Sequence, residues 1–197
     1  MIRLNLSFQN TYSKTRAIFR VVLFPILGLI ALIYLLLILS IFYILCFAGL
    51  VQTIITKQYP DYASKWALYT GQSILRIQMF FIGLNDNYPS LKFGFSDTDL
   101  IRLEVDKQTE YSRLLSITYL IMGWMLIIPQ LIWFLLYSFF IFCFAIFSFI
   151  ELCLKGEYNM FFLNYYIYYA RFTARLFVYF TGLRQEYPTF DLSNVDY

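Results

Sequence analysis

The sequence predicts a mainly α-helical integral membrane protein made of two copies of one unit, with a small β-sheet formed by the ends of both copies. Two observations predict this: an internal similarity at an offset of 99 residues, and one long uncharged apolar run in each copy. Residues 2–13 and 101–112 are identical at six of twelve positions. Solenoid repeats are about 20–50 residues long, so this offset indicates a duplicated domain. We expect repeat 1 in residues 1–98 and repeat 2 in residues 99–197.

Each copy contains a segment predicted to lie in a membrane. Residues 21–56 form a run of 36 uncharged residues, and residues 114–150 form a run of 37. Uncharged apolar runs above about 18 residues are typical of membrane-embedded segments. A helix of this length would be roughly 54 Å long, whereas the hydrocarbon core is about 30 Å thick. Each run is therefore either a hairpin of two short helices or one long helix, with Pro25 and Pro129 as candidate kinks.

Strands are expected at both ends of each copy. Residues 2–8 alternate apolar and polar side chains, and residues 103–106 repeat the pattern, which is typical of half-buried strands. Residues 91–95 and 190–192 are the expected closing strands, and residues 96–99 are turn-like. A sheet shared by the ends of a copy implies an even number of membrane crossings. The copies would then lie in parallel about an axis near the membrane normal, with the sheet outside the bilayer.

An amphipathic helix is expected after each apolar run, in residues 60–84 and 159–183. Its polar positions recur in both copies and fall within roughly 40° of one another on the helix. Three interpretations are open: a solvated face, a basic groove for anionic headgroups or a partner's carboxylates, or a spanning helix with paired arginines. The candidate lipid- or partner-binding residues are Lys65, Gln72, Arg76, Asn164, Arg171 and Arg175.

The composition argues against an enzyme and against a bound cofactor. The chain has no histidine, and its three cysteines lie in or beside the apolar runs without metal-ligand spacing. Metal, haem and Ser-His sites need ligands or bases of those types. Glu151 and Glu157 lie near one membrane boundary, but their spacing does not recur in the first copy. We expect no catalytic residues, no metal and no cofactor, and the net charge of +3 gives no sign of a nucleic-acid partner.

The basic residues predict the orientation in the membrane. The N-terminal arm carries Arg3, Lys14, Arg16 and Arg20 and no acidic residue. Basic residues concentrate on the cytoplasmic side of membrane proteins. We expect a multi-pass protein with both termini and the sheet in the cytoplasm, and with interfacial tyrosines as anchors.

The order of motifs resembles a bacterial membrane family, domain of unknown function 4389. Repeat 1 departs from the family pattern with Ser13-Lys14 in place of Ser-Arg, and repeat 2 has Asn159 where proline is expected. The resemblance implies residence in the bacterial inner membrane and implies no activity. The motifs that carry it are Arg102-Leu103-Glu104-Val105-Asp106, Ser112-Arg113, Ile128-Pro129, Lys155-Gly156-Glu157-Tyr158, Arg171 to Arg175 and Tyr187-Pro188, with Tyr59-Pro60, Arg76 and Tyr88-Pro89 in repeat 1.

The function expected from these features is that of a non-enzymatic membrane scaffold or accessory subunit. Its partners would be membrane lipids, including anionic headgroups, and another membrane protein or complex. The alternative is a transporter or channel with a path between the two repeats. The main polar residues available to line such a path are Gln52 and Gln130, and these two positions do not align with each other.

Overall fold

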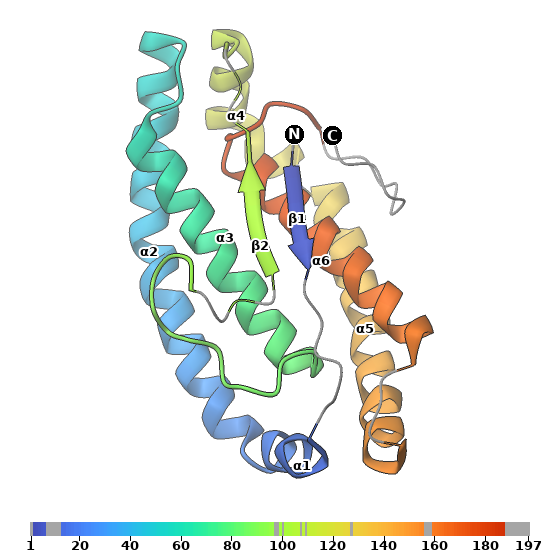
Figure 1. The fold of residues 1–197 in the computed structure, drawn as a ribbon. Coiled ribbons are helices and arrows are strands. Elements are labelled where there is room, and N and C mark those ends of the chain that lie inside the picture. The colour runs from blue at the N-terminus through green and yellow to red at the C-terminus, as the bar shows by residue number, and fades with distance from the viewer. Residues whose placement is uncertain are drawn as a thin grey trace.

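The computed structural model describes residues 2–6, 13–96, 99, 101–106, 108, 110–126, 128–155 and 159–187. In these residues the chain is mainly helical, as predicted, and one strand followed by three helices occurs twice (Figure 1). The elements are β1 (Ile2–Leu6), α1 (Lys14–Val22), α2 (Phe24–Thr56), α3 (Asp61–Ile82), β2 (Ile101–Val105), α4 (Arg113–Leu126), α5 (Ile128–Lys155) and α6 (Met160–Phe180).

The boundaries of corresponding elements differ by the sequence offset of 99 residues. The two strands share both bounds after this shift, α1 and α4 share their first residue, and α2 and α5 share their last. The first residues of α3 and α6 correspond as well. The exception is the start of the long helix, because α2 begins at Phe24 and α5 at Ile128.

In the run 21–56 a single helix, α2, covers residues 24–56, so the hairpin alternative is wrong there, whereas the run 114–150 is divided between α4 and the longer α5. Helix α2 has 33 residues and α5 has 28. Pro25 and Pro129 are each the second residue of their helix, where the missing N–H has no intrahelical partner to lose. After the offset the two prolines differ by five positions. This difference matches the lengths of the preceding helices, nine residues in α1 and fourteen in α4.

The interior of each long helix stays regular at its most polar residues. The Ser40 hydroxyl donates to the Leu36 carbonyl oxygen at 2.7 Å, and Ser138 donates to Phe134 at 2.7 Å. A serine that bonds one turn back remains compatible with a helix in apolar surroundings. These serines therefore mark no turn.

The two strands form an antiparallel pair whose register is symmetric about equivalent residues. Leu4 lies opposite Leu103, its counterpart at the offset of 99, and Ile2 lies opposite Val105. The local two-fold axis of this pair therefore relates equivalent residues of the two halves. The predicted closing strand at residues 91–95 is wrong, because this segment is irregular. The other predicted closing strand, residues 190–192, lies outside the described residues.

Helices α3 and α6 lie between the sheet and the long helices (Figure 1). A Cβ added to Gly71 of α3 would lie 3.0 Å from both Leu103 of β2 and Phe177 of α6. On the α2 side, a Cβ on Gly49 would lie 2.8 Å from that of Ala63. Glycines at these positions let the backbones approach closely. Hydroxyl contacts join α5 to α6, with Ser148 and Tyr166 separated by 2.8 Å.

Candidate membrane-contacting surface

Arg76 of α3 organises the loop that follows its own helix. Its side chain is 4% exposed and forms an ion pair with Asp99 at 2.6 Å. The guanidinium also donates to the carbonyl oxygens of Ser90, Lys92 and Gly94, at 2.6 to 2.9 Å. These carbonyls alternate along the segment predicted to be a closing strand. The segment is therefore held by a side chain instead of a neighbouring strand, because the planar guanidinium provides several donors in a fixed geometry.

Gln72, one turn before Arg76, connects α3 to the sheet. Its amide nitrogen donates to Asp99 at 2.9 Å, and its amide oxygen accepts from the Leu103 backbone N–H at 2.9 Å. Gln72 is fully buried. The expectation that Gln72 and Arg76 face lipid or a partner is therefore corrected: both face their own loop and sheet. The sequence gives no signal for this role of Asp99, because an aspartate in a turn-like cluster is ordinary turn chemistry.

The other four candidate residues lie nearer the surface. Lys65 is exposed and lines a surface cavity of about 430 Å³ with the rings of Tyr62, Trp66, Tyr69 and Phe93. Asn164 is exposed, whereas Arg171 and Arg175 are partly exposed. The six residues therefore do not form one continuous exposed stripe.

The two halves hold each other together at both ends of the long helices. Lys14 donates to the Leu154 carbonyl oxygen at 2.9 Å, and Arg113 donates to that of Ile55 at 3.1 Å. These two contacts are equivalent at the offset of 99. In each, a basic residue at the start of α1 or α4 bonds to the last turn of the other half's long helix, where carbonyls lack intrahelical partners.

A pair of buried tyrosines adds to the contact at one end. The Tyr59 hydroxyl donates to the Thr181 carbonyl oxygen at 2.9 Å, and Tyr111 donates to that of Leu183 at 2.7 Å. Their ring centroids are 5.8 Å apart. Burial raises the pKa of both tyrosines above the usual value. Both hydroxyls therefore remain protonated donors at neutral pH.

A large apolar surface covers α1, α2, α4 and α5. Both α2 and α5 are long and apolar enough to cross a membrane, with mean hydropathies of 2.9 and 2.3. In the most apolar 18-residue stretch of each helix, only 22% and 17% is buried. Soluble monomers rarely expose an apolar patch above a few hundred Å², so exposure on this scale is typical of a surface that contacts lipid or a partner. The exposed side chains include Ile18, Phe19, Val22, Leu29, Leu37, Ile44, Phe47, Ile55, Leu114, Ile121, Leu135, Phe139, Phe142, Phe147 and Leu154.

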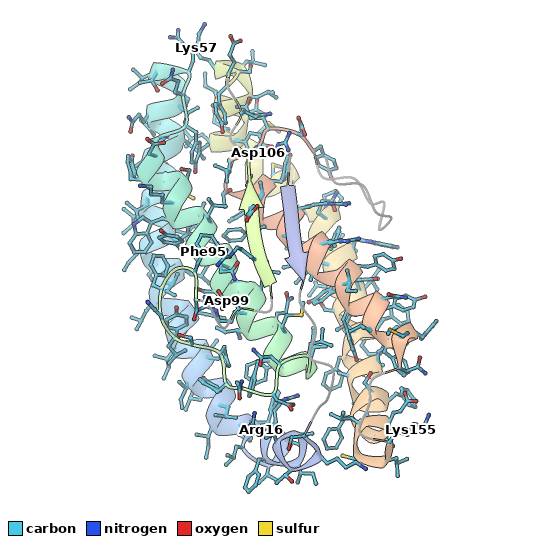
Figure 2. All side chains as sticks on the ribbon, viewed as in Figure 1. Arg16, Lys57, Phe95, Asp99, Asp106 and Lys155 are labelled. Carbon is cyan, nitrogen blue, oxygen red and sulfur yellow. The ribbon has the colours of Figure 1, made fainter. Side chains whose placement is uncertain are left out.

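The sheet side of the molecule carries exposed charged residues, together with the exposed loop residues Leu91 and Phe95. Lys92, Arg102, Glu104 and Asp106 are all exposed there. In Figure 2 the labelled Asp106, Phe95 and Asp99 lie beside the strands, between Lys57 at one end of the molecule and Arg16 and Lys155 at the other. Exposed charge therefore occurs at both ends of the molecule and also beside the strands, at Arg102, Glu104 and Asp106.

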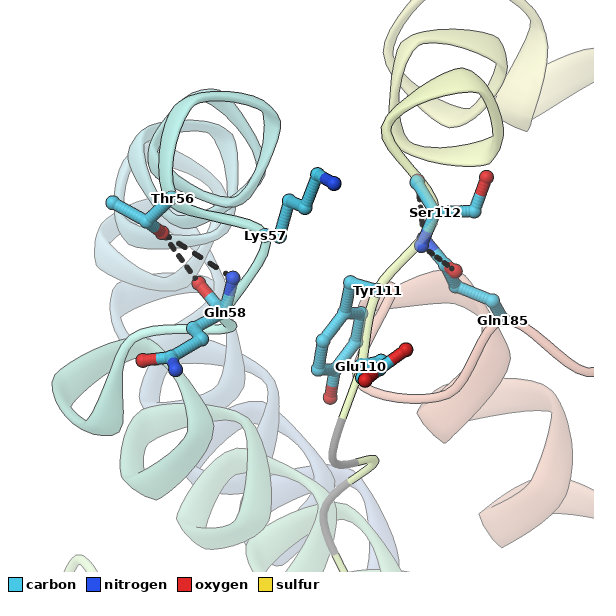
Figure 3. Close-up of a pocket in the computed structure, with 7 residues that line it drawn as sticks. All are labelled: Thr56, Lys57, Gln58, Glu110, Tyr111, Ser112 and Gln185. Atoms are coloured by element: carbon cyan, nitrogen blue, oxygen red, sulfur yellow. Dashed lines mark hydrogen bonds between the residues drawn. The ribbon is translucent and has the colours of Figure 1, made fainter.

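A polar cavity of about 610 Å³ lies where the end of α2 meets the start of α4 (Figure 3). One wall is rigid, because Gln185 accepts from the Ser112 N–H at 3.0 Å and donates to the Ser112 carbonyl oxygen and the Ser116 hydroxyl. The residues that line the cavity are Thr56, Lys57, Gln58, Glu110, Tyr111, Ser112 and Gln185.

Comparison with known proteins gives no relative: no family model, no curated protein and no solved structure matches this chain. The resemblance to domain of unknown function 4389 stays a prediction from the motifs.

Proposed function

We propose that this chain is a non-enzymatic membrane scaffold that inserts its apolar surface into one leaflet, with α2 and α5 parallel to the membrane plane. The observation that carries the proposal is the one-sided distribution of exposed side chains. Large apolar residues cover the four outer helices, whereas the sheet side exposes Arg102, Glu104 and Asp106. A protein with one apolar and one charged face lies at the interface of a bilayer.

A crossing orientation conflicts with the position of the sheet. With α2 along the membrane normal, the two-stranded sheet and its charged residues would lie near the middle of the hydrocarbon core. Open sheet edges leave backbone groups unsatisfied there, and charged side chains are expensive at that depth. Helix α2 has 33 residues and is about 50 Å long, which exceeds the hydrocarbon thickness of about 30 Å. This length is no obstacle when the helix lies parallel to the membrane plane.

We further propose that the two halves are copies of one unit, related by a two-fold axis along the membrane normal. The symmetric register about Leu4 and Leu103 supports this. Ring contacts recur as well: Phe80 and Tyr88 are 5.2 Å apart, as are their counterparts Tyr179 and Tyr187. Such an axis places both apolar faces in the same leaflet. The number of crossings is then zero, in place of the multi-pass topology expected from the sequence, and both termini lie on one side.

In this proposal the protein belongs to the bacterial inner membrane, with its sheet side in the cytoplasm, as the basic N-terminal arm favours. The apolar layer is about one helix, 10 Å, thick and occupies one leaflet only. Expansion of a single leaflet bends a membrane, so the lipids around the protein would be organised by its shape. The charged face is left for a partner protein, and Lys65 beside its aromatic cavity is placed to meet anionic headgroups.

The alternative of a transporter gains no support from the two glutamines of the apolar runs. Gln52 is exposed and accepts from the Tyr62 hydroxyl at 3.2 Å, whereas Gln130 is fully buried. These side chains do not line a shared path.

Thiol labelling from one side of the membrane tests the proposal. Gln58 and Asn87 are exposed, and they lie near opposite ends of α2, because Gln58 follows the last residue of α2 by two positions and Asn87 accepts from Arg16 of α1 (Figure 2). Each would be changed to cysteine in a chain whose Cys46, Cys143 and Cys153 are replaced. An impermeant reagent should label both from the same side of sealed vesicles. Labelling from opposite sides would show that α2 crosses the bilayer.

A further inference from the structure

We infer that the cavity beside Lys57 binds the zwitterionic headgroup of an aminophospholipid, with the phosphate on Lys57 and the primary ammonium on Glu110. This inference rests on the proposed membrane insertion and names the lipid chemistry that one end of the molecule recognises. It is carried by the conformation of Lys57, by two charged groups without partners, and by the apolar residues beside the cavity.

Lys57 has a backbone conformation that a lysine rarely adopts. It caps the end of α2 with φ of 59° and is the only non-glycine residue with positive φ in the described chain. A side chain in the left-handed region costs about 1–2 kcal/mol, and glycine is the usual residue at this cap. The residue at the equivalent sequence position of the second half is Gly156. Strain of this kind is typical of functional positions, and here it aims an amine into a cavity.

The two charges in the cavity have no internal partners. Among the described residues, neither the Lys57 amine nor the Glu110 carboxylate forms a hydrogen bond or an ion pair. Their backbones are nevertheless fixed near each other, since the Tyr111 N–H donates to the Lys57 carbonyl oxygen at 3.3 Å. Figure 3 shows the Lys57 side chain extending across the gap toward Ser112. The cavity therefore presents one cation and one anion to a ligand.

This charge pair selects a ligand that carries both signs. A phosphate accepts from a lysine ammonium, and a primary ammonium donates to a carboxylate, both as charge-assisted hydrogen bonds. A purely anionic headgroup would meet the Glu110 charge, and a quaternary ammonium has no N–H to donate. The volume of about 610 Å³ lies within the range of small-molecule sites.

The surroundings of the cavity favour a lipid over a soluble phosphoester. Ile55 precedes the lining residue Thr56, Leu114 follows the lining residue Ser112 by two positions, and the two side chains are 68% and 74% exposed. Both belong to the apolar surface, so a bound headgroup has positions for its acyl chains beside it. The equivalent sequence positions of the other half are Gly156 for Lys57 and Thr11 for Glu110. The pair of opposite charges is therefore present in the sequence at this end of the molecule and has no counterpart at the equivalent positions of the other half.

The test uses the full chain in detergent micelles, with native mass spectrometry to count bound dihexanoyl lipids. The wild type should retain phosphatidylethanolamine about tenfold more strongly than phosphatidylglycerol or phosphatidylcholine, and more strongly than free phosphoethanolamine. The variants are Lys57→Gly and Glu110→Thr, which carry the residues of the other half. Lys57→Gly should lose the preference while keeping or raising thermal stability, because glycine relieves the positive φ. Lys155→Ala, at the opposite end, is the matched control and should bind like the wild type.

Several results would overturn the inference. Equal retention of the three lipids would show that the cavity does not distinguish headgroups. Equally strong binding of free phosphoethanolamine would show that the ligand is a soluble phosphoester and not a lipid. A preference that survives in Lys57→Gly and Glu110→Thr would place the site elsewhere. Failure of the protein to associate with vesicles would contradict the proposed function instead, and the micelle experiment distinguishes the two failures.

Discussion

At the scale of single residues, buried polar side chains determine how the polar face is built. Arg76 replaces a strand as the partner of alternating carbonyls, and Gln72 bonds to both the sheet and Asp99. The spacing of these residues on α3 is visible in the sequence. The sequence does not show whether these side chains face solvent. The same helical spacing is found when a polar stripe is solvated and when it is covered by a loop of the protein itself.

Removal of Arg76 should destabilise the protein strongly. Arg76→Met leaves the Asp99 carboxylate buried without its main partner, which costs about 3–5 kcal/mol. Arg76→Lys keeps the charge but loses the multiple donors, and should fall between Arg76→Met and the wild type. Thermal unfolding in detergent measures both variants. Lys65→Ala, at an exposed position of the same helix, is the control and should change stability by less than about 0.5 kcal/mol; an equal loss in Lys65→Ala would refute the assigned role.

The buried tyrosines predict a loss of stability in alkali. The pKa values of Tyr59 and Tyr111 are raised by burial, so the folded state retains protons that the unfolded state releases above a pH of about 10. The contribution of these two tyrosines to the free energy of unfolding is intact below that pH. It falls as the pH rises further, by up to about 1.4 kcal/mol per pH unit for each tyrosine. Unfolding between pH 8 and 11.5 measures it. The Tyr59→Phe and Tyr111→Phe double variant should show a shallower slope, and an unchanged slope would contradict the assignment.

At the scale of elements, the repeat and the apolar runs predicted most of the helices. The start of β1 matches the predicted strand, whereas β2 begins at Ile101, two residues before the predicted segment 103–106. Helices α3 and α6 each begin one residue after the predicted start. Each long helix begins one residue before a proline, and this proline differs in position between the halves. Residues 91–95 alternate apolar and polar side chains but form no strand. The alternating pattern does not specify which group bonds to the backbone, and here the carbonyl oxygens bond to the Arg76 side chain. The Lys57 cavity was also not predictable, because it joins residues distant in the sequence.

Two glycines of α2 should respond in opposite ways to alanine. Gly49→Ala puts a Cβ 2.8 Å from that of Ala63, and overpacking of this kind costs about 1–3 kcal/mol. Gly28 has nothing within 4 Å of an added Cβ, so Gly28→Ala should stabilise the helix by up to about 1 kcal/mol. Thermal unfolding of the two variants compares them directly. Equal effects would show that α2 and α3 do not pack at Gly49.

At the scale of the whole molecule, the proposed single-leaflet insertion predicts an effect on membrane shape. An apolar layer in one leaflet favours curved bilayers, so addition of the protein to large vesicles should produce tubules or small vesicles, seen by electron microscopy. Leu37→Asp with Phe139→Asp puts charge on the two long helices and should weaken both insertion and remodelling. Lys92→Ala, on the charged face, is the control. Remodelling that persists without insertion would contradict the mechanism.

The depth of α2 in the bilayer tests the central claim most directly. Spin labels at Leu29, Leu37, Ile44 and Ile55, each more than half exposed, can be compared by oxygen and nickel accessibility in vesicles. Parallel insertion predicts that all four lie in one leaflet, at depths within about 10 Å of one another, which is the diameter of a helix. A depth that increases to the bilayer centre near Leu37 and decreases again toward Ile55 would show a crossing helix and contradict the account.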